Sequence, residues 1–341
     1  MPHSELSLEQ IVAMAKKDMG VDLLGVLRYL LLHLTNRFRR LIFPILYKRS
    51  VKLPGGSVYR LTARTVVKVG VFEDLACEAE ATQYISERTN LPIPRVYDLF
   101  TRREGKQETS YLIMSYMPGI MLQRHWRQLT FAQHESVMRQ VKDMISVLRS
   151  LPQPEPGKWI GTVSRGPFND RLVGRNYLYG PFQTEEQFND FRMEYFNQTP
   201  WSDIPEVVAQ VADIRRRMPV DSNIVFTHGD INQRNLLIDV KGDRPEDVQI
   251  TALIDWEQAG WRPAYWEKLK IRYQSGVGPQ WKRWREMIEA YHQDLRRETE
   301  IALVIGGSGA RPSFKWWNNG SLAGVEPASE CVPAQAAVSY V

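Results

Sequence analysis

Two kinds of hydrophobic pattern divide the chain. Between residues 51 and 117, apolar residues form short β-rich runs that are separated by polar turns, which is typical of strands. One segment in this region instead has apolar residues at near-helical spacing and ends before two prolines. The expected strands cover 58–61, 65–69, 91–100 and 110–117, and the expected helix covers 73–90. The pattern therefore predicts a small, mostly antiparallel sheet with one helix.

After Gly119 the pattern becomes helical. A helix is predicted to begin after Thr130, because Gln133 stands three residues later and the pair forms a capping box. Further helices are expected over 184–196, 204–218 and 278–304. The stretch 152–182 is rich in proline and glycine and predicts an irregular surface segment. In the last helix, Trp281 and Trp284 share one side, which favours packing in a core over a ligand-binding role.

These elements predict an α+β protein with a small β-rich lobe and a larger helical lobe. The expected parts are a helical N-terminal extension over 1–50, the first lobe over 51–117, the second lobe over 118–305, and a disordered tail over 306–341. The lobe boundary is placed near Pro118, where the strand pattern ends at a Pro-Gly pair. Small ligands often bind between domains, so we expect the functional residues to lie there.

Composition narrows the class of protein. The chain has 341 residues, 43% hydrophobic and 24% charged, which is an ordinary globular balance. The net charge of +5 favours anionic ligands but is too small to indicate nucleic acid, and no nucleic-acid motif accompanies it. Cys77 and Cys331 lie far apart and suggest no disulfide framework. With a polar, acidic N-terminal stretch that does not resemble a signal peptide, this predicts a cytoplasmic protein. The pattern leaves the oligomeric state open.

The most membrane-like stretch lies within the N-terminal extension, over residues 22–50. Basic residues, among them Arg28 and the cluster 37–40, interrupt its apolar run before it reaches the length of a spanning helix. No membrane-spanning segment is therefore expected. Two interpretations stay open: a helix packed on the main body, or a basic amphipathic helix that touches anionic lipid.

The polar residues of the stretch THGDINQRNLLID lie between two apolar, strand-like runs. Asp230 and Asn235 would be presented by a loop whose flanking strands are buried. Asp255 follows another apolar strand, 25 residues after Asp230. Oxygen ligands in small number suit Mg²⁺, which keeps water and takes substrate phosphates as further ligands. We therefore predict Asn235 and Asp255 as metal ligands and Asp230 as the group that accepts or orients a hydroxyl proton.

These residues carry a family resemblance. The run HGDINQRN matches the H-G-D-x-x-x-x-N loop of the aminoglycoside phosphotransferase and choline kinase group, and LIDWEQAGW resembles the metal-binding segment of that group. Fungal members are the most similar, and they also resemble the chain at VVKVG, LPIPRVYD and YGPFQTEEQFN. The resemblance covers about residues 51–295. It implies the two-lobed, protein-kinase-like fold and the use of ATP and Mg²⁺.

The resemblance also implies roles for residues of the first lobe. Lys68 matches the lysine that holds the α- and β-phosphates, and Glu78 matches the helix glutamate that pairs with this lysine. Glu80 is the alternative, but it faces elsewhere on the helix. The strand YLIMSYM matches the linker that binds adenine through its backbone, here Ser115, Tyr116 and Met117.

Two positions depart from kinase patterns. The stretch LPGGSVYR has Gly55 and Gly56 but no G-x-G-x-x-G, so Ser57 and backbone amides are the candidates for covering the phosphates. His228 matches a residue that orients the loop. Gly229 stands where protein kinases have the arginine of His-Arg-Asp, which argues against regulation by activation-loop phosphorylation.

The function expected from this resemblance is transfer of the γ-phosphoryl group of ATP to a hydroxyl of a small molecule. A nucleotide-binding pseudokinase or scaffold is the alternative, and a protein kinase is a third possibility. The fold does not determine the acceptor. Glu257 with Trp256, Trp261, Tyr265 and Trp266 would either line an acidic, aromatic acceptor site suited to a cation or, for the tryptophans, pack in the core.

Overall fold

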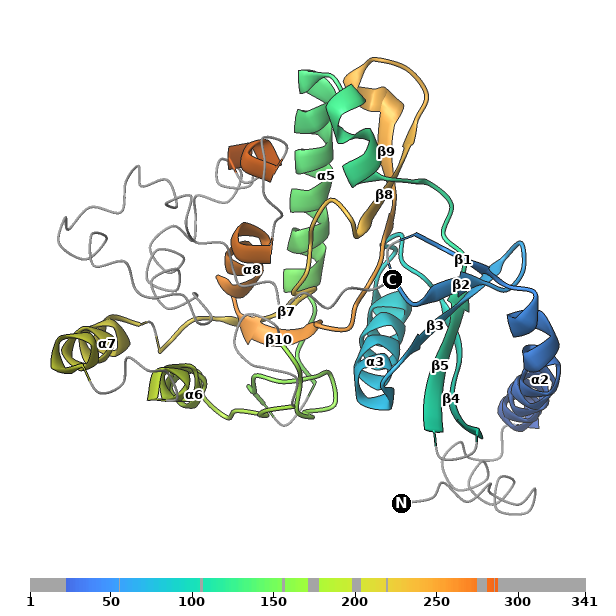
Figure 1. The fold of residues 1–341 in the computed structure, drawn as a ribbon, viewed down its shortest axis with the longest axis horizontal. Coiled ribbons are helices and arrows are strands. Elements are labelled where there is room, and N and C mark those ends of the chain that lie inside the picture. Colours follow the sequence, from blue (N-terminus) through green and yellow to red (C-terminus); the bar gives the residue numbers. More distant parts are fainter. Residues whose placement is uncertain are drawn as a thin grey trace. The chain divides into compact units, whose positions relative to one another are not determined.

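The computed structural model describes residues 23–54, 56–104, 107–154, 157–170, 178–197, 204–218, 220–274, 281–284 and 286–287 (Figure 1). Their backbone contacts divide them into two compact units. The first unit comprises the described residues up to Val69 together with Tyr97–Tyr116. The second comprises Gly70–Val96 and the described residues from Met117 onward. The helix that follows the first hairpin is thus counted with the second unit, whereas the sequence pattern grouped it with the strands.

The first unit is a five-stranded sheet with one long helix. Its elements are α2 (Leu23–Lys48), β1 (Val51–Lys52), β2 (Val58–Arg60), β3 (Thr65–Gly70), β4 (Val96–Glu104) and β5 (Gln107–Ser115). The strand order is β1-β2-β3-β5-β4. In the hairpin of β2 and β3, Val58 lies opposite Lys68, so the strands expected from the sequence are confirmed.

The helix α2 packs on this sheet through aromatic residues. Phe43 is buried, and its ring lies 5.1 Å from that of Phe100 and 4.8 Å from that of Tyr111, centroid to centroid. Arg40 donates two hydrogen bonds, of 2.9 and 2.8 Å, to the buried carboxylate of Asp98. The described end of the N-terminal extension is therefore attached to the first unit. Residues 1–22 lie outside the described part of the chain.

The second unit is mostly helical and contains two small sheets. Its helices are α3 (Phe72–Arg88), α4 (Leu122–His125), η1 (Trp126–Gln128), α5 (Phe131–Arg149), α6 (Glu185–Asn197), α7 (Pro205–Arg217), η2 (Pro245–Asp247) and α8 (Trp266–Gln274). Its strands are β6 (Ile120–Met121), β7 (Ile224–Thr227), β8 (Leu236–Val240), β9 (Val248–Leu253) and β10 (Gly260–Pro263). They form the sheets β6-β8-β9 and β10-β7.

Local signals explain several of these boundaries. The capping box predicted at the start of α5 is present: Thr130 Oγ1 accepts from the N–H of Gln133, and the Gln133 side chain accepts from the N–H of Thr130.

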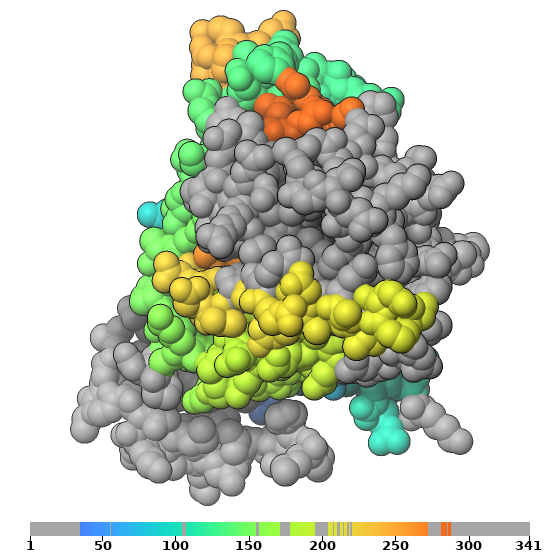
Figure 2. Space-filling model, turned by 90° about the vertical axis from the view of Figure 1, so that its left-hand side faces the viewer, coloured from blue at the N-terminus to red at the C-terminus, as the bar shows by residue number. Residues whose placement is uncertain are grey.

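The helices α6 and α7 lie next to each other on the face shown in Figure 2, where Arg215 donates to Asp190. Trp281 and Trp284 are buried in the main core cluster, which confirms their packing role. The expected tail, 306–341, lies outside the described residues.

The prediction that residues 152–182 form an irregular surface segment was correct about the irregular backbone and wrong about the surface position. The backbone is irregular, but Trp159, Phe168 and Asp170 are buried. Isolated bridges pair Ile160 with Phe182 and Phe168 with Tyr179, so backbone groups are satisfied without long strands. Phe168 and Tyr179 form a second core cluster with residues of α6 and α8. The proline and glycine residues indicate an irregular backbone here. The aromatic residues among them pack in the core, so this part of the segment is buried.

The aromatic residues after Asp255 also pack inside. Trp256, Trp261, Tyr265 and Trp266 each have 0% exposed surface. Trp256 Nε1 donates to the carbonyl of Leu253, which closes the turn after β9. These four side chains therefore belong to the core, and they do not line an acceptor site.

Candidate functional site

His228 fixes the orientation of the loop between β7 and β8. The imidazole is fully buried, and its Nδ1 accepts a hydrogen bond of 3.1 Å from the backbone N–H of Asp230. Because Nδ1 accepts, Nε2 carries the proton, and it lies 3.0 Å from the carbonyl oxygen of Ile254. The ring thus ties the loop to the chain just before Asp255. This matches the orienting role expected for His228.

The side chain of Glu267, on α8, holds the backbone of the same loop. No sequence pattern pointed to this residue. Its Oε2 accepts from the N–H of His228 at 2.6 Å and from that of Gly229 at 3.1 Å. Burial raises the pKa of the Glu267 carboxyl group, while these N–H donors favour the carboxylate. The partners are 39 and 38 residues apart in sequence, so only the folded chain shows the contact.

Gly229 adopts a conformation that requires glycine. Its φ is 75°, and a Cβ atom there would lie 2.6 Å from the backbone oxygen of Gln258. A side chain would therefore be strained and would also push against a backbone that cannot move freely. The residue departs from the His-Arg-Asp pattern for a reason in the structure: the loop passes too close to the chain after β9.

The carboxylate of Asp230 is held by two asparagines. Asn232 Nδ2 donates to Oδ1 and Asn235 Nδ2 donates to Oδ2, both at 3.0 Å. A carboxylate only accepts, so the atom of Asn235 that contacts it must be the amide nitrogen, and the amide oxygen points elsewhere. The structure therefore brings Asp230 and Asn235 together as one hydrogen-bonded group.

Asp255 is placed beside this group by the backbone of Ile254. The N–H of Ile254 donates to the backbone oxygen of Asn235 at 2.9 Å, and its carbonyl contacts His228. Asp255 itself has φ of 70°, which is uncommon for residues other than glycine and costs energy. Such strained positions cluster at functional sites. The three candidate residues Asp230, Asn235 and Asp255 thus lie on segments that are hydrogen-bonded to one another.

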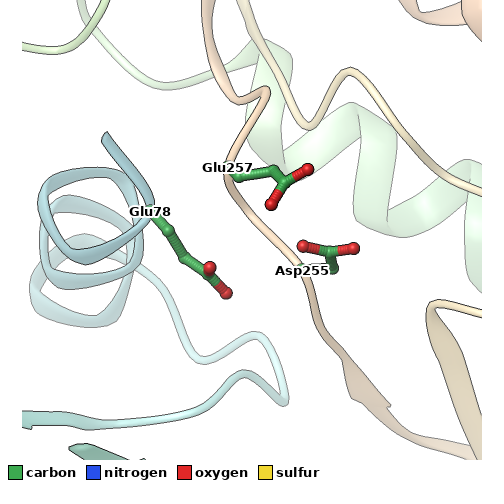
Figure 3. Close-up of side chains that lie close together, drawn as sticks. All are labelled: Glu78, Asp255 and Glu257. Atoms are coloured by element: carbon green, nitrogen blue, oxygen red, sulfur yellow. The ribbon is translucent and has the colours of Figure 1, made fainter. Parts of the chain in front are cut away.

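Three carboxylates gather around Asp255. One oxygen each from Glu78, Asp255 and Glu257 lie within 4.8 Å of one another, and Figure 3 shows the side chains pointing together, Glu78 from α3 and the others from the segment after β9. Glu78 is buried, whereas Glu80 is half-buried and is not part of the group. This favours Glu78 over Glu80 as the functional residue on α3. Glu257, which the sequence places among candidates for an acceptor site, lies in this group of carboxylates.

This donor set fits a magnesium ion. All the candidate groups are oxygens, namely carboxylates and the Asn235 amide, and Mg²⁺ prefers such hard ligands. Carboxylates this close repel one another unless a cation or a proton lies between them. The chemistry of the residues therefore agrees with the metal that the sequence resemblance implies.

Ser57 and Lys68 lie in the first unit, on one hairpin. The N–H of Val69 donates to the carbonyl of Ser57 at 2.8 Å, which places Ser57 beside the end of the strand that carries Lys68. Because Glu78 belongs to the other unit, the expected Lys68–Glu78 pair stays a prediction.

The linker residues Ser115, Tyr116 and Met117 follow β5. The N–H of Tyr116 donates to the carbonyl of Arg64 at 2.8 Å, and Arg60 stacks on the Tyr116 ring at 3.9 Å. That N–H is therefore engaged within the first unit. Adenine contacts of the linker would fall to its carbonyl groups and to the residues on either side.

A second buried polar group lies behind the loop. The ammonium group of Lys270 donates to Asp170 at 2.5 Å and to Gln258 at 2.7 Å. Trp266 Nε1 donates to the other Asp170 oxygen. Burial lowers the pKa of Lys270, and the Asp170 carboxylate opposes this. The group connects segment 157–170 to α8, the helix that also carries Glu267.

Two buried strands that hold an Asp–Asn loop, followed by a strand-end aspartate, define a protein of the kinase-like class. Consistent with this, residues 55–301 match the model of the phosphotransferase enzyme family, and the chain belongs to that family. A search of curated protein sequences found no match.

Solved structures of similar fold come from aminoglycoside phosphotransferases. The GDP complex of aminoglycoside 2'-phosphotransferase-IIIa has a TM-score of 0.54 at 11% identity and covers 80% of this chain and 89% of its own. The GDP and kanamycin complex of APH(2")-IIia has a TM-score of 0.53 at 12% identity, covering 76% and 83%. A thermostable APH(4)-Ia variant with AMP-PNP and hygromycin B has a TM-score of 0.51 at 18% identity, covering 76% and 84%. At these identities the likeness shows the fold alone, and that fold is the kinase-like fold predicted from the sequence.

Proposed function

We propose that the protein transfers the γ-phosphoryl group of ATP to a hydroxyl of a small molecule in a Mg²⁺-dependent reaction. The observation that carries this proposal is the hydrogen-bonded group of Asp230, Asn235 and the segment before Asp255. Phosphoryl transfer needs mainly positioning and charge stabilisation from a protein. A loop clamped by His228 and Glu267 supports such positioning.

Asp230 is the proposed catalytic residue. Its carboxylate accepts the proton of the acceptor hydroxyl as the oxygen of that hydroxyl forms a bond to the γ-phosphorus and the bond to the leaving ADP breaks. The asparagine donors at both oxygens fix the orientation of the carboxylate. Lys68 and Ser57 would bind phosphate groups, and Ser115, Tyr116 and Met117 would bind adenine through their backbone.

Asn235 and Asp255 are the proposed magnesium ligands. Bound Mg²⁺ would neutralise phosphate charge. The Asn235 oxygen is available for this because the nitrogen is the atom that contacts Asp230. Glu78 and Glu257 lie near enough to Asp255 to complete or tune the ligand set.

Two alternatives are distinguished by features of the loop. A nucleotide-binding pseudokinase or scaffold would not require the alignment of Asp230. Its carboxylate and carbonyl oxygens accept four hydrogen bonds from the side-chain amides of Asn232 and Asn235. A protein kinase regulated by phosphorylation would use an arginine where this chain has Gly229, and the space there does not admit a side chain. A small-molecule acceptor is therefore the proposal that the loop supports best.

The acceptor is the least specific part of the proposal, because many classes of hydroxyl compound are open. Two of the similar structures described above contain kanamycin or hygromycin B. Both proteins have low sequence identity to this chain. The aromatic residues expected to recognise a cation are buried in this chain. We therefore propose a hydroxyl acceptor without a requirement for antibiotic structure. A cytoplasmic location and a fungal origin also stay proposals from the sequence.

The test is a nucleotide and acceptor screen of the purified full chain. ADP release is measured with ATP or GTP, with and without Mg²⁺, against panels of aminoglycosides, amino alcohols, sugars and a generic protein substrate. The proposal expects Mg²⁺-dependent turnover that rises with one small-molecule class. Turnover with the protein substrate alone would support a protein kinase. Nucleotide binding without turnover on any panel would support the pseudokinase.

A further inference from the structure

The long helix of the first unit has two apolar faces, and only one of them is covered. Phe43 faces the sheet and is buried. Phe38, Leu41 and Ile45 are spaced by three and four residues, so they lie on one other face, and they are 61%, 75% and 59% exposed. Helices of soluble proteins normally direct charged residues to solvent at such positions. This exposed stripe is defined here as Phe38, Leu41 and Ile45.

The surroundings of the stripe are basic. Arg37 stands one turn before Leu41 and Lys48 two turns after it, so both lie along the same edge of the stripe, and both are exposed. Arg49 and Lys52 follow at the end of the helix and on β1, again exposed, beside Val51, which is 66% exposed. Long basic side chains can extend away from an apolar surface while their methylene groups cover it.

The charge of this region is one-sided over a long stretch. Residues 23–72 contain ten lysines and arginines and no aspartate or glutamate, so the rest of the chain has a net charge of −5. Acidic residues that could screen the helix locally are therefore absent from this stretch of sequence. The partner that matches the surface must offer both negative charge and an apolar layer.

We propose that the exposed stripe of α2 docks the protein on the surface of an anionic lipid bilayer. The apolar side chains would enter the boundary between headgroups and acyl chains, and the flanking lysines and arginines would contact anionic headgroups. Among the described residues, no helix is long and apolar enough to cross a membrane, so α2 would lie on the surface. A nucleic acid would leave Leu41 and Ile45 exposed.

A second copy of the chain is the main competing occupant. Pairing two α2 helices through the same stripe would bring Arg37 and Lys48 of one copy close to the equivalent charges of the other. Like charges at that range repel, whereas an anionic bilayer attracts both rows. The distribution of charge therefore favours lipid over self-association.

The test is co-sedimentation of the full chain with large unilamellar vesicles. One preparation is pure phosphatidylcholine and the other contains about one third phosphatidylserine, each at low and high salt. Wild type is expected to bind the anionic vesicles, to bind neutral ones more weakly, and to lose binding as salt rises.

Paired variants separate the two parts of the surface. Leu41→Gln and Ile45→Gln keep helix propensity and should each weaken binding by roughly tenfold, since each removes a side chain from the acyl layer. Lys48→Gln and Arg49→Gln should each weaken it by about fivefold, and only on anionic vesicles. Val208→Gln on α7, where Val208 is 50% exposed, is the matched control and should bind as wild type. Circular dichroism and ATP affinity verify folding of each variant.

Three results would overturn the proposal. The first is a failure of wild type to bind anionic vesicles at low salt. The second is a Leu41→Gln/Ile45→Gln double variant that binds as well as wild type. In the third, sedimentation equilibrium would show a wild-type dimer that Leu41→Gln dissociates while vesicle binding is absent. That result would assign the stripe to a second copy of the chain.

Discussion

Replacing Asp255 with asparagine should abolish the gain in thermal stability that Mg²⁺ gives the protein. One Asp255 oxygen lies within 4.8 Å of an oxygen of Glu78 and of Glu257, so the three carboxylates are placed to share one cation. Asparagine has nearly the same size and tolerates the positive φ of 70° found there. The substitution therefore removes the charge while keeping the backbone.

The size of the effect follows from the linkage between binding and unfolding. Wild type should gain about 2.7 kcal/mol of unfolding free energy when Mg²⁺ reaches roughly one hundred times its Kd. For a unit of this size such a gain raises Tm by about 5–10 °C. Asp255→Asn removes a carboxylate from the group that would hold the ion, so it should lose most of this gain.

The assay is thermal unfolding of wild type and Asp255→Asn, each with EDTA and with Mg²⁺, at low salt. Only wild type should gain in Tm with Mg²⁺. Asp243→Asn, at an exposed position, is the control for removing one negative charge and should follow wild type. An unchanged gain in Tm with Mg²⁺ in Asp255→Asn would refute the assignment of this carboxylate to the metal.

Three further predictions concern the loop and a half-buried thiol. Gly229→Ala should lower ATP turnover by about 10²-fold, because the new Cβ would be too close to Gln258 and would push the loop away from it. Gly157→Ala is the control: Gly157 also has positive φ but lies in open space, so this variant should keep turnover. Glu267→Ala should destabilise the protein by about 2–6 kcal/mol, since two buried N–H groups lose their acceptor, whereas Glu246→Ala at an exposed site should cost little in denaturant unfolding. Burial raises the pKa of Cys77 from 9.0 to about 11, so alkylation should reach half its limiting rate near pH 11. The raised pKa stabilises the fold below pH 9, and this contribution, at most about 3 kcal/mol, is lost as pH rises to about 11; Cys77→Ser should remove that part of the pH dependence.

Local signals allowed much of this structure to be predicted. The capping box of Thr130 and Gln133 starts a helix wherever it is found before an apolar face, and it does so here. The strands beside Asp230 and before Asp255 were readable because a short apolar run bounded by polar residues suits a buried strand. These features depend on neighbours within a few residues.

The remainder depends on contacts between distant segments. Glu267 accepts from backbone N–H groups almost forty residues earlier, and no spacing rule predicts such a contact. The left-handed conformation of Asp255 follows Ile254, whose N–H donates to the distant Asn235, a contact that no local pattern predicts. The proline and glycine content of residues 152–182 predicts a surface segment, but Phe168 and Asp170 within it are buried.

The most direct test of the proposed reaction is the turnover of Asp230→Asn. Asparagine keeps the size of the side chain and removes the oxygen that accepts the proton, so kcat should fall by about 10²–10⁴-fold. ATP affinity, measured by calorimetry, should stay nearly unchanged, because Asp230 is not among the residues proposed to bind nucleotide. Wild-type turnover in this variant, with ATP still bound, would contradict the phosphotransferase account.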